Sequence, residues 1–131
     1  MSLLLDTNIV SELARVRPNA DVLAWADKVT THAISVVTIE EICNGLAANP
    51  SSRIETFMNA FFASETCYPV TSDIAFRAGN LRGSFKRRGI VREQADMLIA
   101  ATAQAHGLTL VTRNVRDFDG CGIALLNPFT E

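Results

Sequence analysis

Cysteine and histidine are scarce in this chain, and their positions argue against zinc or disulfide chemistry. The 131 residues include three cysteines and two histidines. Cys43, Cys67 and Cys121 are odd in number, far apart and without a C-x-x-C pair, so we expect reduced thiols that pack in the interior. His32 and His106 fall at a predicted strand edge and a predicted helix end, and neither is placed for a zinc site.

Long hydrophobic runs and an excess of charge are also absent. No window reaches the roughly 18 apolar residues of a transmembrane helix, and the chain lacks the positive start and long apolar stretch of a secretory signal. We therefore expect a soluble cytoplasmic protein with no membrane contact. The 12 basic and 14 acidic side chains give a net charge of −2, which excludes a uniformly basic nucleic-acid binder but not a local basic patch.

The chain does contain enough hydrophobic residues for one core. Apolar residues make up 48% of the sequence and no repeat or linker divides it, so residues 1–131 are predicted to form a single domain. Short apolar runs alternate with stretches of helical periodicity. Strands are predicted at 2–5, 32–35, 66–70, 108–112 and 123–126. Helices, caps included, are predicted at 7–15, 19–29, 38–48, 51–62, 72–87 and 93–106.

The predicted strands are apolar throughout and do not alternate, which is typical of parallel strands covered on both faces. This pattern predicts an α/β fold with a short parallel sheet of about five strands, in the order 3-2-1-4-5, and helices on both faces. In such a sheet the first and fourth strands are neighbours where the strand order reverses. Sites form beyond the carboxyl ends of strands at this point.

Four acidic residues come from the ends of predicted strands or from within helices, where an isolated carboxylate is costly. They are Asp6, Glu41, Asp96 and Asp117. Two such charges about 4 Å apart repel by ~4 kcal/mol at an effective dielectric of 20, and a hard cation removes this conflict. Carboxylate oxygens suit Mg²⁺ or Mn²⁺. We therefore predict that the four acids converge around such an ion.

Each acid also has a structural alternative that the sequence leaves open. Asp6 could cap the helix that follows it. Glu41 could close an S/T-x-x-E capping box with Thr38. Asp96 could form a buried ion pair with an arginine, and Asp117 could serve only a turn. The metal hypothesis therefore rests on the four acids as a set.

A magnesium–carboxylate site suits hydrolysis of a phosphodiester, because the cation meets phosphate oxygens and activates water. The chain lacks the G-x-x-x-x-G-K-[ST] loop typical of nucleoside triphosphatases. Segment 82–92 concentrates positive charge just before the helix of Asp96, which predicts contacts with nucleic-acid phosphates; a solvated helix end is the alternative. The predicted RNA-binding residues are Arg82, Lys86, Arg87, Arg88 and Arg92.

Five segments between residues 3 and 129 share the motifs of one known family. They read L-L-L-D-T-N (3–8), T-I-E-E-I-C-N-G (38–45), A-D-M-L-I-A-A-T-A (95–103), L-V-T-R-N-V-R-D-F (110–118) and N-P-F (127–129). Together they resemble the PIN-domain ribonucleases, most closely the VapC-type toxins of bacterial toxin–antitoxin pairs and the related FitB proteins. The resemblance implies a single PIN-like domain and a magnesium- or manganese-dependent endoribonuclease.

The same resemblance implies roles for individual residues. It places the family's acids at Asp6, Glu41 and Asp96, and leaves the fourth position open between Asn114 and Asp117, of which we favour Asp117. The residues expected to support the site are Asn8, Thr112 and Asn114. The resemblance further implies a homodimer, inhibition by a small VapB-type antitoxin, and contact with operator DNA only through that antitoxin.

Two other classes of function are alternatives. A non-catalytic PIN-fold regulator would bind RNA or a protein partner without needing the acids. A phosphotransfer domain fits less well, because a receiver needs paired acids after its first strand and a lysine after its last. A phosphatase of the haloacid dehalogenase type needs D-x-D, where this chain has Asp6-Thr7-Asn8.

Overall fold

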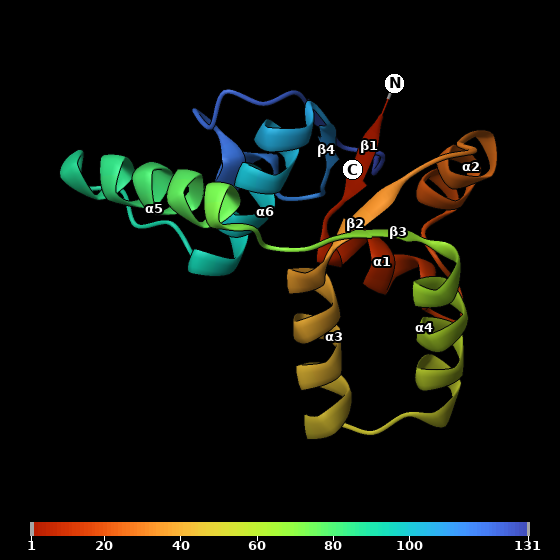
Figure 1. The fold of residues 1–131 in the computed structure, drawn as a ribbon. Helices are drawn as coiled ribbons and strands as arrows, with labels where there is room; N and C mark the ends of the chain where they lie inside the picture. Colours follow the sequence, from red (N-terminus) through yellow and green to blue (C-terminus); the bar gives the residue numbers. More distant parts are fainter. Residues whose placement is uncertain (1, 131) are drawn as a thin grey trace.

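Five short strands form one parallel sheet with helices around it (Figure 1). The structure is a computed structural model and describes residues 2–130. The strands are β1 (Leu3–Leu5), β2 (Ala33–Ser35), β3 (Thr66–Tyr68), β4 (Thr109–Val111) and β5 (Leu125–Leu126). The helices are α1 (Thr7–Leu13), α2 (Ala20–Lys28), α3 (Val36–Ala48), α4 (Ser52–Ser64), α5 (Ser72–Arg87), α6 (Gln94–His106) and the 3₁₀ helix η1 (Val115–Phe118).

The sheet has the predicted order, β3-β2-β1-β4-β5, and every neighbouring pair is parallel. The central strand β1 is buried on both faces. Leu4 packs with α5 and α6, whereas Leu3 and Leu5 pack with α1, α2, α3 and α4. Because successive side chains of a strand point to opposite faces, helices cover the sheet on both sides, as predicted.

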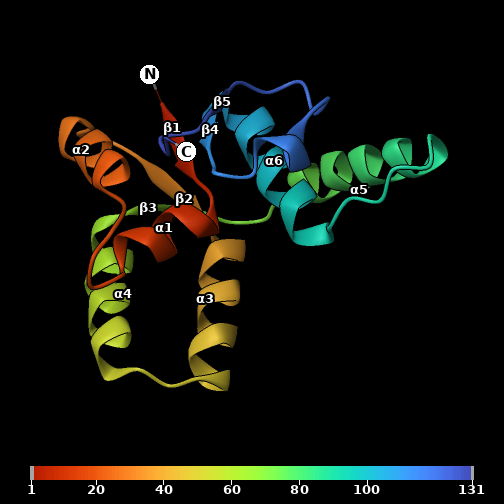
Figure 2. The ribbon, with the colours of Figure 1, turned by 180° about the vertical axis from the view of Figure 1, so that it is seen from behind.

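Two groups of helices project from the sheet in different directions (Figures 1 and 2). α3 and α4 run side by side as one arm, with α1 at its base, and α5 extends outward from its contact with α6. Among the helices in the described part of the chain, none combines the length and hydrophobicity needed to cross a bilayer.

Two helix starts differ from the prediction because a different hydroxyl caps the helix. α3 begins at Val36, two residues before the predicted start at Thr38. The hydroxyl of Ser35 caps it by accepting a hydrogen bond of 3.0 Å from the backbone N–H two residues on. In the same way Thr71, and not Ser72, caps α5.

The other element ends lie within one or two residues of the predicted ones. β3 is an edge strand, as predicted, and it ends at Tyr68, because Pro69 has no N–H to donate to the sheet. Gly107 follows α6 with a φ of 63°, which confirms the predicted glycine after this helix.

Candidate active site

The carboxyl ends of β1 and β4 bring Asp6 and Thr112 into contact at the centre of the sheet. Leu5 pairs with Val111 in register, so the residues that follow them are neighbours. The Thr112 hydroxyl donates a hydrogen bond of 2.7 Å to Oδ2 of Asp6, whose side chain is buried. This contact lies at the reversal of strand order where the sequence predicted a site.

Both oxygens of Asp6 accept hydrogen bonds from nearby donors. Oδ1 accepts from the Thr7 backbone N–H at 2.8 Å, which makes Asp6 the N-cap of α1. Oδ2 also accepts from Nδ2 of Asn8 at 3.1 Å. Burial outweighs these donors and raises the pKa of Asp6 above its usual value, and the charge of Glu41 acts in the same direction. Asp6 is therefore a helix cap and part of the acidic group at the same time.

Asn8 and Thr112 connect Asp6 to the segment after β4. Nδ2 of Asn8 donates to Oγ1 of Thr112 at 3.3 Å, and Oδ1 of Asn8 accepts from the Arg113 backbone N–H at 3.1 Å. The backbone N–H of Asn114 donates to Oγ1 of Thr112 at 3.0 Å. The three residues expected to support the site thus lie beside Asp6, and Asn114 takes part through its backbone.

Glu41 reaches the same region from α3 through two hydroxyl groups. Oγ1 of Thr7 donates to Oε1 of Glu41 at 2.6 Å and lies 3.0 Å from Oγ1 of Thr38. Since Thr7 has one hydroxyl proton, Thr38 is the donor in the second contact. The capping-box alternative is wrong, because Thr38 is buried within α3 and the Glu41 carboxylate accepts from Thr7.

Sequence reasoning missed Thr7 and Thr38 as parts of this site. Two spacings could have indicated them: Thr38 lies three positions before Glu41, on the same face of one helix, and Thr7 directly follows Asp6. Their mutual contact joins residues 31 positions apart, which no local pattern shows.

Asp96, in the first turn of α6, lies within electrostatic reach of the other three acids. Burial is the largest cause of its pKa of about 6, well above the usual value. The further causes are the negative charges of Asp6, Asp117, Glu41 and Glu93, in that order. No arginine pairs with Asp96 within the described part of the chain, so the ion-pair alternative is wrong. The raised pKa shows that carboxylates from four segments share one region.

Asp117 lies on η1, and its side chain is exposed. Its backbone N–H donates to the carbonyl of Asn114 at 3.0 Å, so it does form part of a turn. Its charge also raises the pKa of Asp96, so the turn role does not account for it fully. Of the two candidates for the fourth position, Asp117 is the one whose charge acts on Asp96.

The carboxylate oxygens of Asp6, Glu41, Asp96 and Asp117 are ligands that suit a hard cation. The groups that donate hydrogen bonds to Asp6 and Glu41 are neutral hydroxyls and amides. Within residues 2–130, no group of three or more His, Cys, Asp or Glu side chains is arranged to hold a metal ion together. Mg²⁺ is usually held by only one or two carboxylates, because it keeps several waters. The residues that could hold it directly are Asp6 and Asp96, with Glu41 and Asp117 around it.

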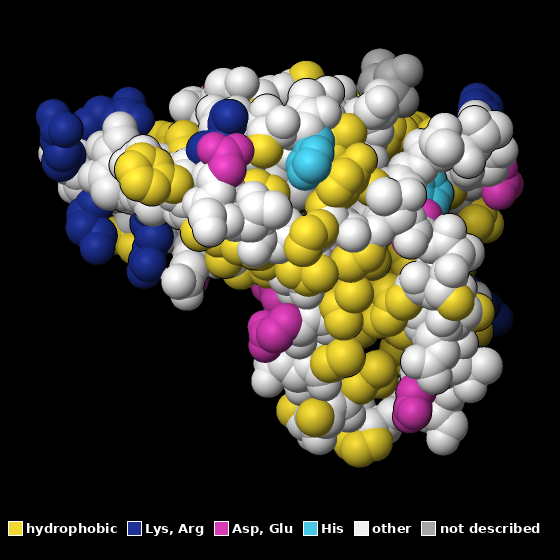
Figure 3. Space-filling model, viewed as in Figure 1, with side chains coloured by type: hydrophobic (Ala, Val, Ile, Leu, Met, Phe, Trp, Pro, Cys, Tyr) yellow, Lys and Arg dark blue, Asp and Glu magenta, His cyan; other side chains and the backbone are white. Residues whose placement is uncertain are grey.

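The predicted RNA-binding side chains lie mainly at the outer end of α5, where Figure 3 shows a dark blue group on the left. Four of them are exposed: Arg82, Lys86, Arg87 and Arg88. Arg92 differs, because its guanidinium donates hydrogen bonds to backbone carbonyls of the η1 segment.

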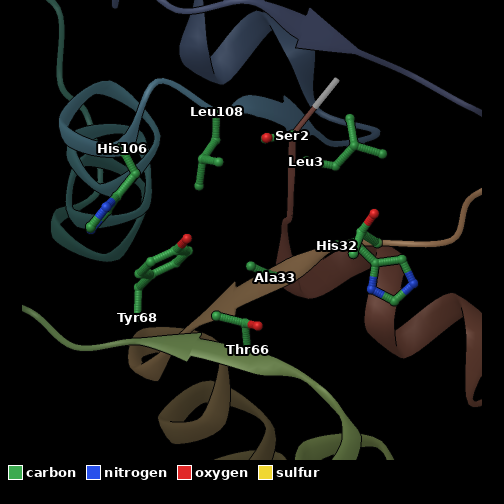
Figure 4. Close-up of a pocket in the computed structure, with 9 residues that line it drawn as sticks. Ser2, Leu3, His32, Ala33, Thr66, Tyr68, His106 and Leu108 are labelled. Carbon is green, nitrogen blue, oxygen red and sulfur yellow. The ribbon is translucent and has the colours of Figure 1, made fainter.

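The cavity drawn in Figure 4 lies at the opposite end of the strands from the acids and measures about 290 Å³. The rings of Tyr68 and His106 stack on one side of it, with centres 4.0 Å apart, and His32 lies on the other side. The exposed Asp117 and half-buried Asp96 instead leave the acidic region open to solvent. An open acidic region suits a polymeric substrate better than a small molecule, which enzymes enclose.

Comparisons with known proteins agree with this geometry. A family model described as the PIN domain matches residues 3–120. The chain is 34% identical to the VapC ribonuclease Y4jK of Sinorhizobium fredii, with 97% of each chain covered. It is 32% identical to toxin FitB of Neisseria gonorrhoeae, with 98% of this chain and 99% of that protein covered.

Two solved structures show the same architecture. The FitAcB structure from Neisseria gonorrhoeae superposes with a TM-score of 0.83 at 30% identity, with 96% of this chain and 97% of that chain covered. VapBC2 from Rickettsia felis, bound to a DNA fragment from its promoter, superposes with a TM-score of 0.84 at 25% identity. That match covers 97% of this chain and 98% of the other.

Proposed function

The chain belongs to the PIN domain family, and we propose on that basis that it is a divalent-metal-dependent endoribonuclease and the toxin of a VapBC-type pair. The observation that carries the proposal is the placement of Asp6, Glu41, Asp96 and Asp117 at one end of the sheet, where burial and neighbouring carboxylates raise the pKa of Asp96 to about 6. Repulsion between these carboxylates destabilises the fold unless a cation binds between them and neutralises their charge. Relatives with names such as ribonuclease and toxin support the reaction class.

Asp6 and Asp96 would hold Mg²⁺ or Mn²⁺, and Glu41 and Asp117 would complete the acidic ring. When bound, the ion supplies a more acidic water and stabilises negative charge on the phosphate. The three donors to Asp6, from Thr7, Asn8 and Thr112, keep its carboxylate oriented without competing for its charge.

Glu41 and Asp117 have a different proposed role from that of Asp6. Glu41 is oriented by the Thr7 hydroxyl, and Asp117 is exposed on η1. Either carboxylate can accept the proton that the attacking water loses, because both reach the region of Asp96. The donors around Asp6 orient its carboxylate toward the ion that it would hold, which leaves proton transfer to Glu41 or Asp117.

RNA would approach along the basic end of α5. The exposed side chains of Arg82, Lys86, Arg87 and Arg88 bind phosphates without reading sequence, so they would place the backbone and not select a base. The site at the start of α6 follows this cluster directly in the chain.

The proposed partners follow from the relatives. FitAcB and VapBC2 are structures of toxin–antitoxin complexes, and the latter holds promoter DNA. We therefore propose a VapB-type antitoxin for this chain, a homodimer of the toxin, and contact with operator DNA only through the antitoxin.

The test is cleavage of RNA by the wild type and by Asp6→Asn and Asp96→Asn, with Mg²⁺ and with a chelator. We expect metal-dependent endonucleolytic cleavage that each substitution lowers by roughly 100-fold or more while circular dichroism stays unchanged. Wild-type rates in either variant would contradict the assignment. Metal-dependent RNA binding without any cleavage by the wild type would favour the alternative, a non-catalytic PIN-fold regulator.

A further inference from the structure

Arg92 joins α5 to the η1 segment through three contacts of one guanidinium group. Nη1 donates to the carbonyl of Arg116 at 3.0 Å, and Nη2 donates to the carbonyl of Asp119 at 3.0 Å. The same group lies 4.4 Å from the centre of the Phe85 ring, which is buried at the end of α5. Arg92 also lies directly before Glu93, the N-cap of the helix that carries Asp96.

The two carbonyls that Arg92 binds flank Asp117 and Phe118. Phe118 is buried in the core and anchors one side of the turn. Asp117 is exposed, so the position of its carboxylate depends on how firmly the backbone of η1 is held. The two hydrogen bonds from Arg92 fix the backbone on both sides of Asp117.

We propose that Arg92 is a positioning residue that fixes η1 so that the Asp117 carboxylate faces Asp96. This inference rests on the proposed function for the role of Asp117, but the contact itself does not. It departs from the sequence-based expectation that Arg92 binds RNA phosphates, since each terminal nitrogen of its guanidinium already donates one hydrogen bond to a carbonyl.

The proposed contribution of Arg92 is geometric. Burial and four carboxylates cause the raised pKa of Asp96, and Arg92 is not among these causes. A planar guanidinium can bind two carbonyls and stack on a ring at once, whereas the ammonium group of lysine cannot. Arg92→Lys should therefore behave like Arg92→Gln.

Arg88 offers a matched control. Its guanidinium also lies over the Phe85 ring, at 4.8 Å, but Arg88 is at the exposed end of α5, outside the η1 segment. Arg88→Gln removes a positive charge beside the same ring without touching the carbonyls that Arg92 binds.

The first experiment is hydrogen exchange in the metal-free protein. The turn amides of Asp117, Asp119 and Cys121 donate to carbonyls within residues 114–118 and should be protected. We expect Arg92→Lys and Arg92→Gln to speed their exchange by roughly tenfold, with α6 amides unchanged and Arg88→Gln silent at the turn. Unchanged turn exchange in both Arg92 variants would overturn the inference, whatever the chain catalyses.

The second experiment is the Mg²⁺ concentration needed for half of the thermal shift and half of the cleavage rate. We expect Arg92→Gln to raise both midpoints by roughly tenfold, with little change in the KM for RNA. In an Asp117→Asn background the same substitution should add nothing further. If Arg92→Gln raises the midpoints as much in the Asp117→Asn background as in the wild type, the inference is wrong. It is also wrong if Arg92→Gln and Arg88→Gln raise the KM for RNA equally and Arg92→Lys restores it.

The two proposals fail in different ways. If the wild type cleaves no RNA with any divalent ion, the proposed function is wrong, and the exchange of the turn amides still decides whether Arg92 holds η1. If cleavage is metal-dependent but the Arg92 substitutions leave the exchange rates of the turn amides unchanged, the proposed function stands and the positioning role is wrong.

Discussion

At the scale of single residues, a structural role of an acid and its proposed functional role can fall on the same side chain. Asp6 caps α1 with one oxygen and accepts from Asn8 and Thr112 with the other. Sequence reasoning gave capping and metal binding as alternatives for this residue, because a local sequence motif suggests only one role for each position. The contacts show that capping leaves Asp6 beside Asn8 and Thr112, so the cap does not exclude the proposed metal-binding role.

Asp96 should make the metal-free protein less stable as pH rises. Its folded pKa of about 6 lies above the unfolded value, so protonation stabilises the fold at low pH, and this stabilisation is lost between about pH 4 and 6. Asp96→Asn should remove that loss and raise the free energy of unfolding at pH 7 by about 1 kcal/mol, a value reduced for solvent at a half-buried side chain. Urea unfolding at several pH values, with a chelator present, measures it. A steeper pH dependence in the variant would contradict this account.

Glu41 and its neighbour Glu40 give a matched pair of substitutions. Glu41 accepts from Thr7 and acts on Asp96, whereas Glu40 is exposed on another face of α3. We expect Glu41→Gln to lower the rate of RNA cleavage by roughly tenfold or more and Glu40→Gln to leave it unchanged. Equal losses in the two variants would show that only the overall charge of α3 matters.

At the scale of elements, sequence reasoning recovered most strands and helices, because apolar runs and helical periodicity are local properties. It misplaced the start of α3, since Thr38 fits a capping box by spacing while Ser35 already caps the helix. The Thr38 hydroxyl instead contacts that of Thr7, 31 positions away. Long-range partners of this kind are what a single sequence does not show.

The end of α6 offers a test at this scale. Gly107 has a φ of 63°, where a β-carbon is strained, so Gly107→Ala should lower the free energy of unfolding by about 1 kcal/mol. Gly79→Ala is the control, because it lies within α5 with open space around it and should stabilise the helix by about 0.5–1 kcal/mol. Chemical denaturation compares the two. The same sign of effect in both variants would contradict the assigned helix end.

At the scale of the whole molecule, strand order brings the acids together. Asp6 and Thr112 meet because β1 and β4 are neighbours, and α6 and η1 bring Asp96 and Asp117 to the same end of the sheet. The sequence predicted this convergence from the order of strands and from the family motifs. It did not predict the hold of Arg92 on η1, because Arg92 looks like one more member of a basic cluster until its carbonyl partners are known.

The basic end of α5 gives a prediction at the same scale. Lys86 and Arg87 are exposed, so replacing both with glutamine should weaken RNA binding and make it less dependent on salt. The slope of the logarithm of affinity against the logarithm of salt concentration should fall in magnitude by about 1 to 2. Filter binding with the catalytically impaired Asp96→Asn protein measures it. An unchanged slope would place the RNA elsewhere.

The measurement that bears most directly on the central claim is the melting temperature of the protein with and without millimolar Mg²⁺. A cation that binds the folded acidic region and not the unfolded chain should stabilise the wild type by about 1.4 kcal/mol at ten times its dissociation constant. We expect a clear rise in melting temperature for the wild type that is lost in Asp6→Asn and Asp96→Asn. An absent rise in the wild type, or an equal rise in both variants, would contradict it.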